Sequence, residues 1–208
     1  KGILLTSSRD EQVIRPPAEI PAWYRHDEVQ LLYPRDPQGG GTWIAVNRYG
    51  SAAVLLNGAF EKHTPQPPYR MSRGVMAPGI LCSEDPPSKV YELDFSGIEP
   101  FTLVLWHNPV LTVYRWDGRQ LYTEHPDIQQ AHIWSSATLY DPAMAEMRRG
   151  WFRDWLTEKP VRDLDGIFSF HREGGNGDAA CSIQMNRNGV LRTVSITGLD
   201  LQPAGMEM

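Results

Sequence analysis

The sequence predicts a single layered α+β domain, and three observations lead to this prediction. Short runs of β-branched and aromatic residues, separated by turn residues, dominate the first part of the chain. A strongly helical stretch follows, and two more strand-like runs come after it. This order, with no internal repeat or linker, is typical of a layered α+β fold, and 208 residues suffice for one sizeable core.

Strands are expected wherever a short apolar run is bounded by turn residues. Residues 42–58 have the pattern of a hairpin whose strands, 43–46 and 52–56, flank a turn at 47–51. A tight turn at 116–119 joins two later strands. The other expected strands are residues 2–8, 89–93, 101–107, 111–116, 120–124, 132–136, 180–186 and 191–197.

The clearest helix is expected at residues 141–158. Asp141 can cap its first turn, and Pro142 suits the first helical position, where an amide N–H would have no partner. An apolar stripe at helical spacing comprises Met144, Met147, Trp151 and Trp155. We also expect a short helix within 70–81 and a weaker one within 163–171.

Composition and charge argue against several classes of partner. A net charge of −5 with dispersed Lys and Arg disfavours nucleic acid, whose phosphates require clustered basic residues. No apolar run approaches the roughly 20 residues needed to cross a bilayer. Two cysteines, Cys82 and Cys181, are too few for a disulfide scaffold and indicate thiols in a reducing compartment. We therefore expect a cytoplasmic protein without a membrane span.

Metal and nucleotide sites are not expected. The histidines His107, His125, His132 and His171 lack metal-ligand spacing, and the glycine loops lack the Gly-Lys-Ser/Thr sequence of a phosphate-binding loop. We therefore expect no metal and no cofactor, and a small-molecule substrate or a hydrophobic ligand as the partner. The oligomeric state is not predicted.

The segment Arg9-Asp10-Glu11 follows the first expected strand, and Arg15-Pro16-Pro17 then stops regular structure. In one interpretation the carboxylate orients a catalytic amine or thiol, and the guanidinium favours the thiolate. In the other, the segment is a solvated strand end with a surface ion pair. Asn57 either donates to a developing oxyanion or caps a turn. The residue types alone leave these alternatives open.

A series of motifs in a fixed order carries a family resemblance. Ser8-Arg9-Asp10-Glu11 with Arg15-Pro16 matches an Asn-Arg-Asp-Glu…Arg-Pro motif, with Ser in place of Asn. Gly40-Gly41-Thr42-Trp43 and a small-residue strand ending in Asn57 follow. Later matches are Ser72-Arg73-Gly74, residues 134–142, where Ser136 replaces an Asn, and residues 185–197. In these motifs the chain resembles the NRDE family, also called the transport-and-Golgi-organisation protein 2 family.

The resemblance implies a branch of the N-terminal-nucleophile (Ntn) hydrolases, distantly similar to bile-salt hydrolases and penicillin V acylases. Such proteins fold as a four-layer αββα sandwich of two antiparallel sheets. Their N-terminal Cys, left after Met removal, is the nucleophile, and its free amine is the base. By this resemblance the strand that bears the Cys precedes Lys1, so we expect a segment upstream of the given sequence.

The resemblance also implies roles for single residues. Asp10 would hold the α-amine and Arg9 would favour the thiolate. Asn57 would help to form the oxyanion hole, and Arg192, or alternatively Arg187, would supply a distal cation. The substrate would lie against Glu11, Trp43, Trp134 and Ser136.

Three functions follow as hypotheses. The leading one is hydrolysis of non-peptide carbon–nitrogen (amide) bonds by the N-terminal Cys. Animal members of the family are linked to haem and lipid handling, so the alternative is a haem- or lipid-binding carrier that uses the same pocket without turnover, with Trp23, Trp43 and Trp134 as walls. The third is a decayed site, which Ser8 and Ser136 would fit.

Overall fold

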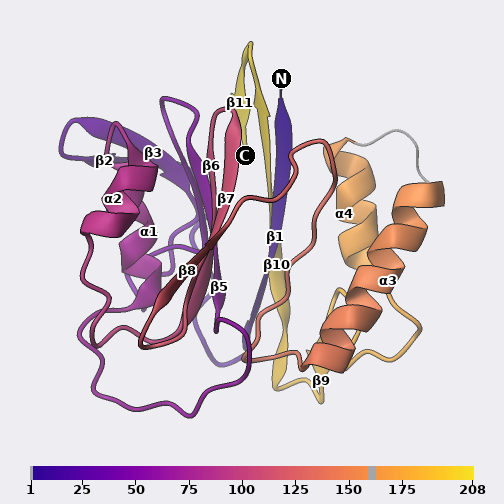
Figure 1. The fold of residues 1–208 in the computed structure, drawn as a ribbon. Helices are drawn as coiled ribbons and strands as arrows, with labels where there is room; N and C mark the ends of the chain where they lie inside the picture. Colours follow the sequence, from indigo (N-terminus) through magenta and orange to yellow (C-terminus); the bar gives the residue numbers. More distant parts are fainter. Residues whose placement is uncertain (1, 159–162) are drawn as a thin grey trace. The chain divides into compact units, whose positions relative to one another are not determined.

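The computed structural model describes residues 2–158 and 163–208, which form two compact units. Unit 1 contains the described residues up to Pro17, Ile133–Ser135 and those from Tyr140 onward. Unit 2 contains Ala18–His132 and Ser136–Leu139. Each unit has its own antiparallel sheet and its own pair of helices (Figure 1).

Unit 2 is built on a sheet of seven described strands, each paired with its neighbour along the chain. The strands are β2 (Ala22–His26), β3 (Val29–Tyr33), β4 (Ile44–Asn47), β5 (Ala52–Asn57), β6 (Phe101–His107), β7 (Val110–Trp116) and β8 (Leu121–Glu124). The expected hairpin of β4 and β5 is confirmed. Its turn is fixed by the buried side chain of Asn47, whose Oδ1 accepts the N–H groups of Tyr49 and Ser51. The Asn47 amide also donates to the carbonyl of Leu81, which ties the turn to a helix.

The helices of unit 2 lie between β5 and β6 in the chain and cover one face of its sheet (Figure 1). Helix α1 (Arg73–Leu81) packs on β4 and β5, and α2 (Pro86–Glu92) packs on β6. The main hydrophobic core lies where these helices pack on the sheet. Burial of its apolar side chains is the dominant favourable contribution to folding. Fully buried members of this core include Leu31, Ile80, Leu81, Leu103 and Leu105.

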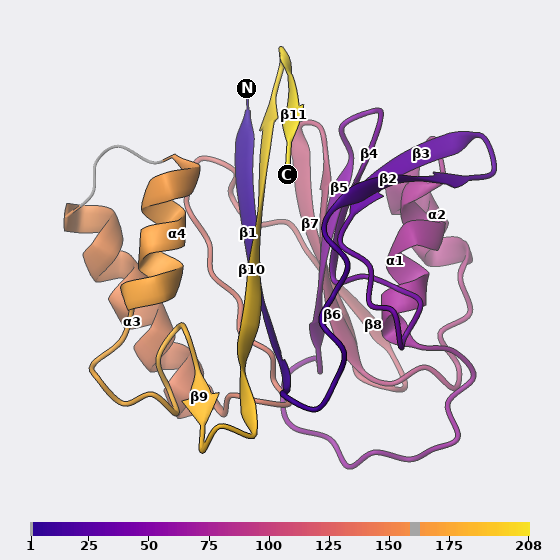
Figure 2. The same cartoon turned by 180° about the vertical axis from the view of Figure 1, so that it is seen from behind.

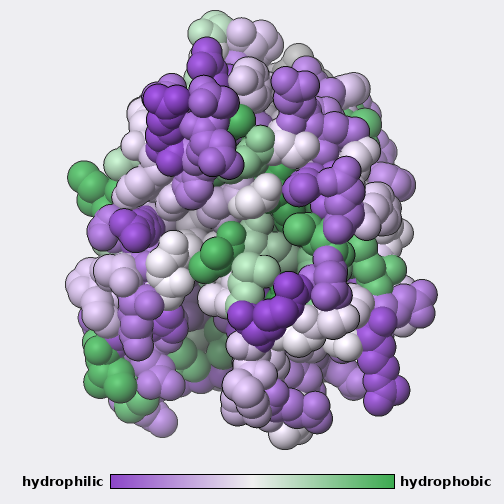
Figure 3. Space-filling view, turned by 90° about the vertical axis from the view of Figure 1, so that its left-hand side faces the viewer, coloured by the Kyte–Doolittle hydropathy of each residue, from purple (hydrophilic) through white to green (hydrophobic). Residues whose placement is uncertain are grey.

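Some large apolar side chains of unit 2 remain at its surface. Ile20, Trp23 and Tyr91 are all at least half exposed. The space-filling view shows a largely polar face that is interrupted by apolar side chains near its middle (Figure 3). Scattered exposure of this kind is normal for a folded protein.

Unit 1 is built on two long strands, β1 (Ile3–Gln12) and β10 (Leu191–Gln202), which pair antiparallel from Ile3 with Leu201 to Gln12 with Leu191. The short strands β9 (Asn186–Arg187) and β11 (Gly205–Glu207) pair with β10. Helices α3 (Pro142–Glu158) and α4 (Leu164–Glu173) cover one face of this sheet, as the view from behind also shows (Figure 2).

Helix α4 approaches the sheet of unit 1 closely. A Cβ atom at Gly198 would lie only 2.6 Å from Cζ of Phe168, so a side chain at that position of β10 would force the Phe168 ring to move. At its start, Asp163 accepts the N–H of Gly166, which satisfies one of the free amide donors of the first turn. Phe170 packs against Phe152 and Trp155 of α3. The helices at 141–158 and 163–171 are therefore confirmed, and α4 extends to Glu173.

Several expected strands are wrong. Residues 89–93 are not a strand; most of them lie in α2, because Asp85 accepts the N–H of Ser88 and the two prolines between them suit the first helical positions. Residues 132–136 form no strand. Of residues 180–186 only Asn186 lies in a strand, because Asp178 accepts backbone N–H groups from residues 180–182 and holds them in a turn. Strands β2, β3 and β11 are not expected from the sequence pattern.

Candidate functional site

The first strand continues through the charged segment instead of ending at Ser8 as expected. It does so because β10 continues to pair with it, so that Asp10 lies opposite Thr193. The pairing shifts by one residue between Arg9 and Asp10: Arg9 pairs with Ser195, and Val194 of β10 has no counterpart. Such bulges redirect side chains and are common next to functional sites.

The carboxylate of Asp10 accepts one hydroxyl hydrogen bond on each oxygen. Thr193 Oγ1 donates to Oδ1 at 2.5 Å, and the hydroxyl of Tyr140 donates to Oδ2 at 2.7 Å. Thr193 Oγ1 in turn accepts the N–H of Met185 at 2.9 Å, so its own proton points to Asp10. Among the residues that the structure describes, no cation lies within ion-pair distance of this carboxylate. The Asp10 charge is therefore oriented by neutral donors.

Arg9 and Glu11 flank Asp10 on the same strand. Arg9 is only 7% exposed, and its Nη2 lies 3.7 Å from a carboxylate oxygen of Glu11. Arg15 approaches the same oxygen at 3.1 Å. Glu11 is thus shared by two guanidinium groups.

Two arginines lie close to the ring of Tyr140. The guanidinium carbon of Arg148 is 4.0 Å from the ring centroid, and that of Arg187 is 5.4 Å from it. Arg148 is buried and donates to the carbonyls of Cys181 and Ser182 at 3.1 and 2.7 Å. Burial and the nearby charge of Asp10 raise the pKa of Tyr140 well above its ordinary value, so the phenol stays protonated.

His171 of α4 holds the part of β1 that leads to Asp10. Its Nε2 lies 2.8 Å from Thr6 Oγ1, and its Nδ1 lies 2.8 Å from Ser8 Oγ. Burial, and secondarily the positive charge of Arg148, lower the pKa of His171 to about 4. Ser8 is therefore hydrogen-bonded to a neutral His171 imidazole.

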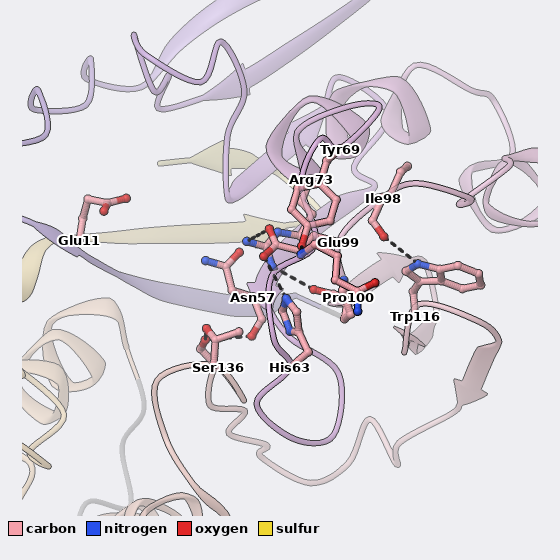
Figure 4. Close-up of polar contacts among 12 residues, drawn as sticks. Glu11, Asn57, His63, Tyr69, Arg73, Ile98, Glu99, Pro100, Trp116 and Ser136 are labelled. Carbon is pink, nitrogen blue, oxygen red and sulfur yellow. Dashed lines mark hydrogen bonds and ion pairs between the residues drawn. The ribbon is translucent and has the colours of Figure 1, made fainter.

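In unit 2, Asn57 ends β5 and is exposed. The hydroxyl of Ser136 donates to the Asn57 backbone carbonyl at 2.9 Å (Figure 4). The next residue, Gly58, donates its N–H to Pro100 and accepts a hydrogen bond from Thr102, both at 2.9 Å. These hydrogen bonds fix the backbone at Asn57. Ser136 contributes to this by donating its hydroxyl to the Asn57 carbonyl.

A chain of three ionisable side chains, Arg73, Glu99 and His63, lies beside this corner. Arg73 Nη2 is 2.8 Å from one oxygen of Glu99, and His63 Nε2 is 2.9 Å from the other (Figure 4). Arg73 also donates to the carbonyl of Pro100 at 3.0 Å, the same oxygen that accepts the N–H of Gly58. All three side chains are mostly buried, and burial lowers the pKa of Arg73.

The remaining predicted site residues are divided between the units. Arg192 is exposed on β10 opposite Glu11, and Trp134 is half-buried in unit 1. Trp43 is half-buried in unit 2, next to β4. Arg187, the alternative distal cation, is the farther of the two arginines near the ring of Tyr140. The catalytic and substrate-binding roles of all these residues stay predictions.

Sequence reasoning missed the partners of the predicted residues. Tyr140 and Thr193 bond to Asp10 across 130 and 183 positions of sequence. Both lie in family-matched segments, 134–142 and 185–197, but nothing in these segments links either residue to Asp10. Tyr140 also immediately precedes the Asp-Pro start of α3. The described residues contain no group of three or more potential metal ligands and no helix long and apolar enough to cross a bilayer.

Comparison with known proteins places this fold. The sequence matches the family described as Transport and Golgi organisation 2 over residues 2–167. The structure is similar to that of penicillin V acylase from Agrobacterium tumefaciens, with a TM-score of 0.50, 13% identity, and coverage of 96% of this chain and 72% of the acylase. At this identity the similarity concerns the fold alone, and it confirms the expected Ntn-hydrolase-like class with two antiparallel sheets. No curated protein matches the sequence. Because the family match spans most of its length, the chain belongs to the Transport and Golgi organisation 2 family.

Proposed function

We propose that this protein hydrolyses non-peptide carbon–nitrogen (amide) bonds with an N-terminal Cys that precedes Lys1. The observation that carries the proposal is the Asp10 carboxylate: it is partly buried, oriented by two hydroxyl donors, and without a cation in ion-pair contact among the described residues. A partly buried carboxylate is stabilised by an opposite charge or by donors. Each oxygen keeps a lone pair for another donor, and the α-amine of a nucleophilic Cys is such a donor.

In this mechanism the α-amine takes the thiol proton, and the thiolate attacks the amide carbonyl. The carbon–nitrogen bond then breaks, the leaving amine takes the proton from the α-ammonium, and water hydrolyses the resulting thioester. Asp10 accepts an N–H of the α-amine throughout, and the buried guanidinium of Arg9 favours the thiolate. The family resemblance gives Asn57 the role of an oxyanion donor and Arg192 that of the distal cation.

The proposal also includes the substrate-facing residues. Glu11, Trp43, Trp134 and Ser136 are proposed to contact the substrate. Ser136 already donates to the Asn57 carbonyl, so we propose that it contributes shape and not an oxyanion hydrogen bond. Penicillin V and simple N-acyl amides are suitable first substrates, with release of the free amine as the measured product.

The test uses the full-length protein with its upstream segment. The second-order rate of alkylation of the N-terminal thiol by iodoacetamide is measured for the wild type and for Asp10→Asn. We expect the substitution to slow alkylation about tenfold, because a hydrogen bond to a charged group contributes about 1.5–3 kcal/mol. Amide hydrolysis should fall with it.

A matched control is Asp200→Asn, which removes a carboxylate from β10 that bonds only to the neighbouring Gln202 amide in the described contacts. This variant should react like the wild type. An upstream thiol whose alkylation is the same in Asp10→Asn and in the wild type, together with no amide cleavage, would overturn the proposed function.

A further inference from the structure

We propose that Tyr140 is a positioning residue for this reaction: its hydroxyl, together with that of Thr193, fixes the plane in which the Asp10 carboxylate receives the α-amine. The inference rests on the proposed function and deepens it, because it identifies what orients the group that holds the base. It assigns a role to Tyr140, which lies in the family-matched segment 134–142 but was not among the predicted site residues.

The two hydroxyl groups restrain Asp10 from different directions. Tyr140 bonds to Oδ2 and Thr193 bonds to Oδ1, so rotation of the carboxylate about its Cβ–Cγ bond would break both contacts. The Thr193 hydroxyl cannot turn away without losing the N–H of Met185. Each oxygen of an ionised carboxylate accepts more than one hydrogen bond, so both retain acceptor capacity in a defined direction. A carboxylate held in this way presents the amine with a preorganised acceptor.

Tyr140 itself has two cationic neighbours. Arg148 and Arg187 approach its ring, and Arg148 is anchored to the backbone at Cys181 and Ser182. The raised pKa of Tyr140 keeps its hydroxyl a donor throughout the range in which an amine and a thiol exchange a proton.

The first test is a double-mutant cycle in the full-length protein. Alkylation by iodoacetamide is measured for Tyr140→Phe, Asp10→Asn and the double variant. Tyr140→Phe should slow alkylation about fivefold, as expected for loss of one hydrogen bond to a charged acceptor. In the Asp10→Asn background the same change should have no further effect, because a residue that acts through Asp10 has nothing left to position. Thr193→Val should behave like Tyr140→Phe.

A purely structural role predicts a different result. If Tyr140→Phe slows alkylation equally in the wild-type and Asp10→Asn backgrounds, the two effects are additive and the inference is wrong. The proposed function would still be supported by the slower alkylation of Asp10→Asn. If Asp10→Asn has no effect on a reactive upstream thiol, the proposed function fails first. The matched control is Tyr24→Phe, which removes a surface hydroxyl–carboxylate bond to Glu19 and should change nothing.

The second test does not depend on catalysis. With tyrosine labelled at Cζ, the NMR signal of Tyr140 is assigned from its absence in Tyr140→Phe, and its titration is followed in Asp10→Asn. Removing the Asp10 charge should lower the pKa of the Tyr140 phenol, since that charge is one of the causes of its rise. An unchanged titration would show that the two side chains are not coupled, and would overturn the inference whatever the enzyme does.

Discussion

In unit 1 the side chain of Asp10 is fixed by hydroxyl groups from Tyr140 and Thr193, whereas in unit 2 the structure fixes the backbone beside Asn57 and leaves the amide side chain exposed. The two candidate groups are thus positioned by different means. For Asp10 the determining contacts are side chain to side chain. For Asn57 they are hydrogen bonds from Ser136, and around Gly58, to main-chain atoms.

This difference has a consequence for how each group responds to mutation. A carboxylate held by side chains can lose its orientation while the fold stays intact, so its partners are accessible to functional tests. A side chain placed by its backbone moves only when the local fold moves, so substitutions around it report mainly on stability. Three predictions examine how far this distinction holds, beginning with the largest expected effect.

Arg148→Ala should destabilise unit 1 most. The side chain is buried, donates to two main-chain carbonyls and lies on the ring of Tyr140, so truncation leaves the carbonyls of Cys181 and Ser182 without these donors and opens a cavity. Each buried carbonyl left without its donor costs about 1–3 kcal/mol, and the cavity adds to this loss. Urea unfolding followed by circular dichroism measures the loss.

The neighbouring Arg149 provides the control. It is exposed and pairs with Glu146 on the same helix, so Arg149→Ala should cost at most about 0.5 kcal/mol. Equal losses for the two arginines would mean that the contacts of Arg148 do not support the region that holds Asp10.

Acidification should destabilise unit 1 through His171. In the folded protein this histidine has a pKa of about 4, against 6.5 for the unfolded chain, so the unfolded state takes up a proton first as the pH falls. The contribution to the free energy of unfolding is therefore complete above pH 6.5 and is lost progressively between pH 6.5 and pH 4. The shift corresponds to about 3 kcal/mol.

Unfolding by urea between pH 7 and pH 4 checks this, with His171→Gln as the comparison. The Gln variant keeps polar groups near Thr6 and Ser8 but cannot titrate, so its stability should fall less over the same interval. Parallel curves for the two proteins would show that His171 is not the group responsible.

Much of the fold was predictable because its signals are local. The β4–β5 hairpin follows from two apolar runs around a turn, and helix α3 follows from its start at Pro142 and the stripe of Met and Trp. The strand expected at 89–93 failed because the cap formed by Asp85 and the following prolines outweighed a short apolar run. Strand β1 runs past Ser8 because its partner β10 does, and pairing between distant strands leaves no local signal.

The candidate site was predictable only where a motif marks it. Arg9, Asp10 and Asn57 could be named from family resemblance, and the structure places Asp10 in contacts that suit the proposed role. Tyr140 and Thr193 could not be named, because each touches Asp10 only after the chain has folded. The ion pair of Arg73 with Glu99 could not be predicted either, because it links the start of α1 to a residue 26 positions later in the chain.

The smallest predicted effect concerns the backbone at Asn57. Gly58 has φ +83°, and a Cβ atom there would lie 3.0 Å from Cβ of Ala137. Gly58→Ala should therefore cost about 2 kcal/mol, from left-handed strain and from the close contact. Gly118→Ala is the matched control: φ is +100°, but the nearest atom, on Pro100, is 3.7 Å from the new Cβ, so only the strain of about 1 kcal/mol remains. Thermal unfolding of both variants measures the difference, and a loss at Gly58 no larger than that at Gly118 would mean that the corner has room to adjust and that Asn57 is less firmly placed than Asp10.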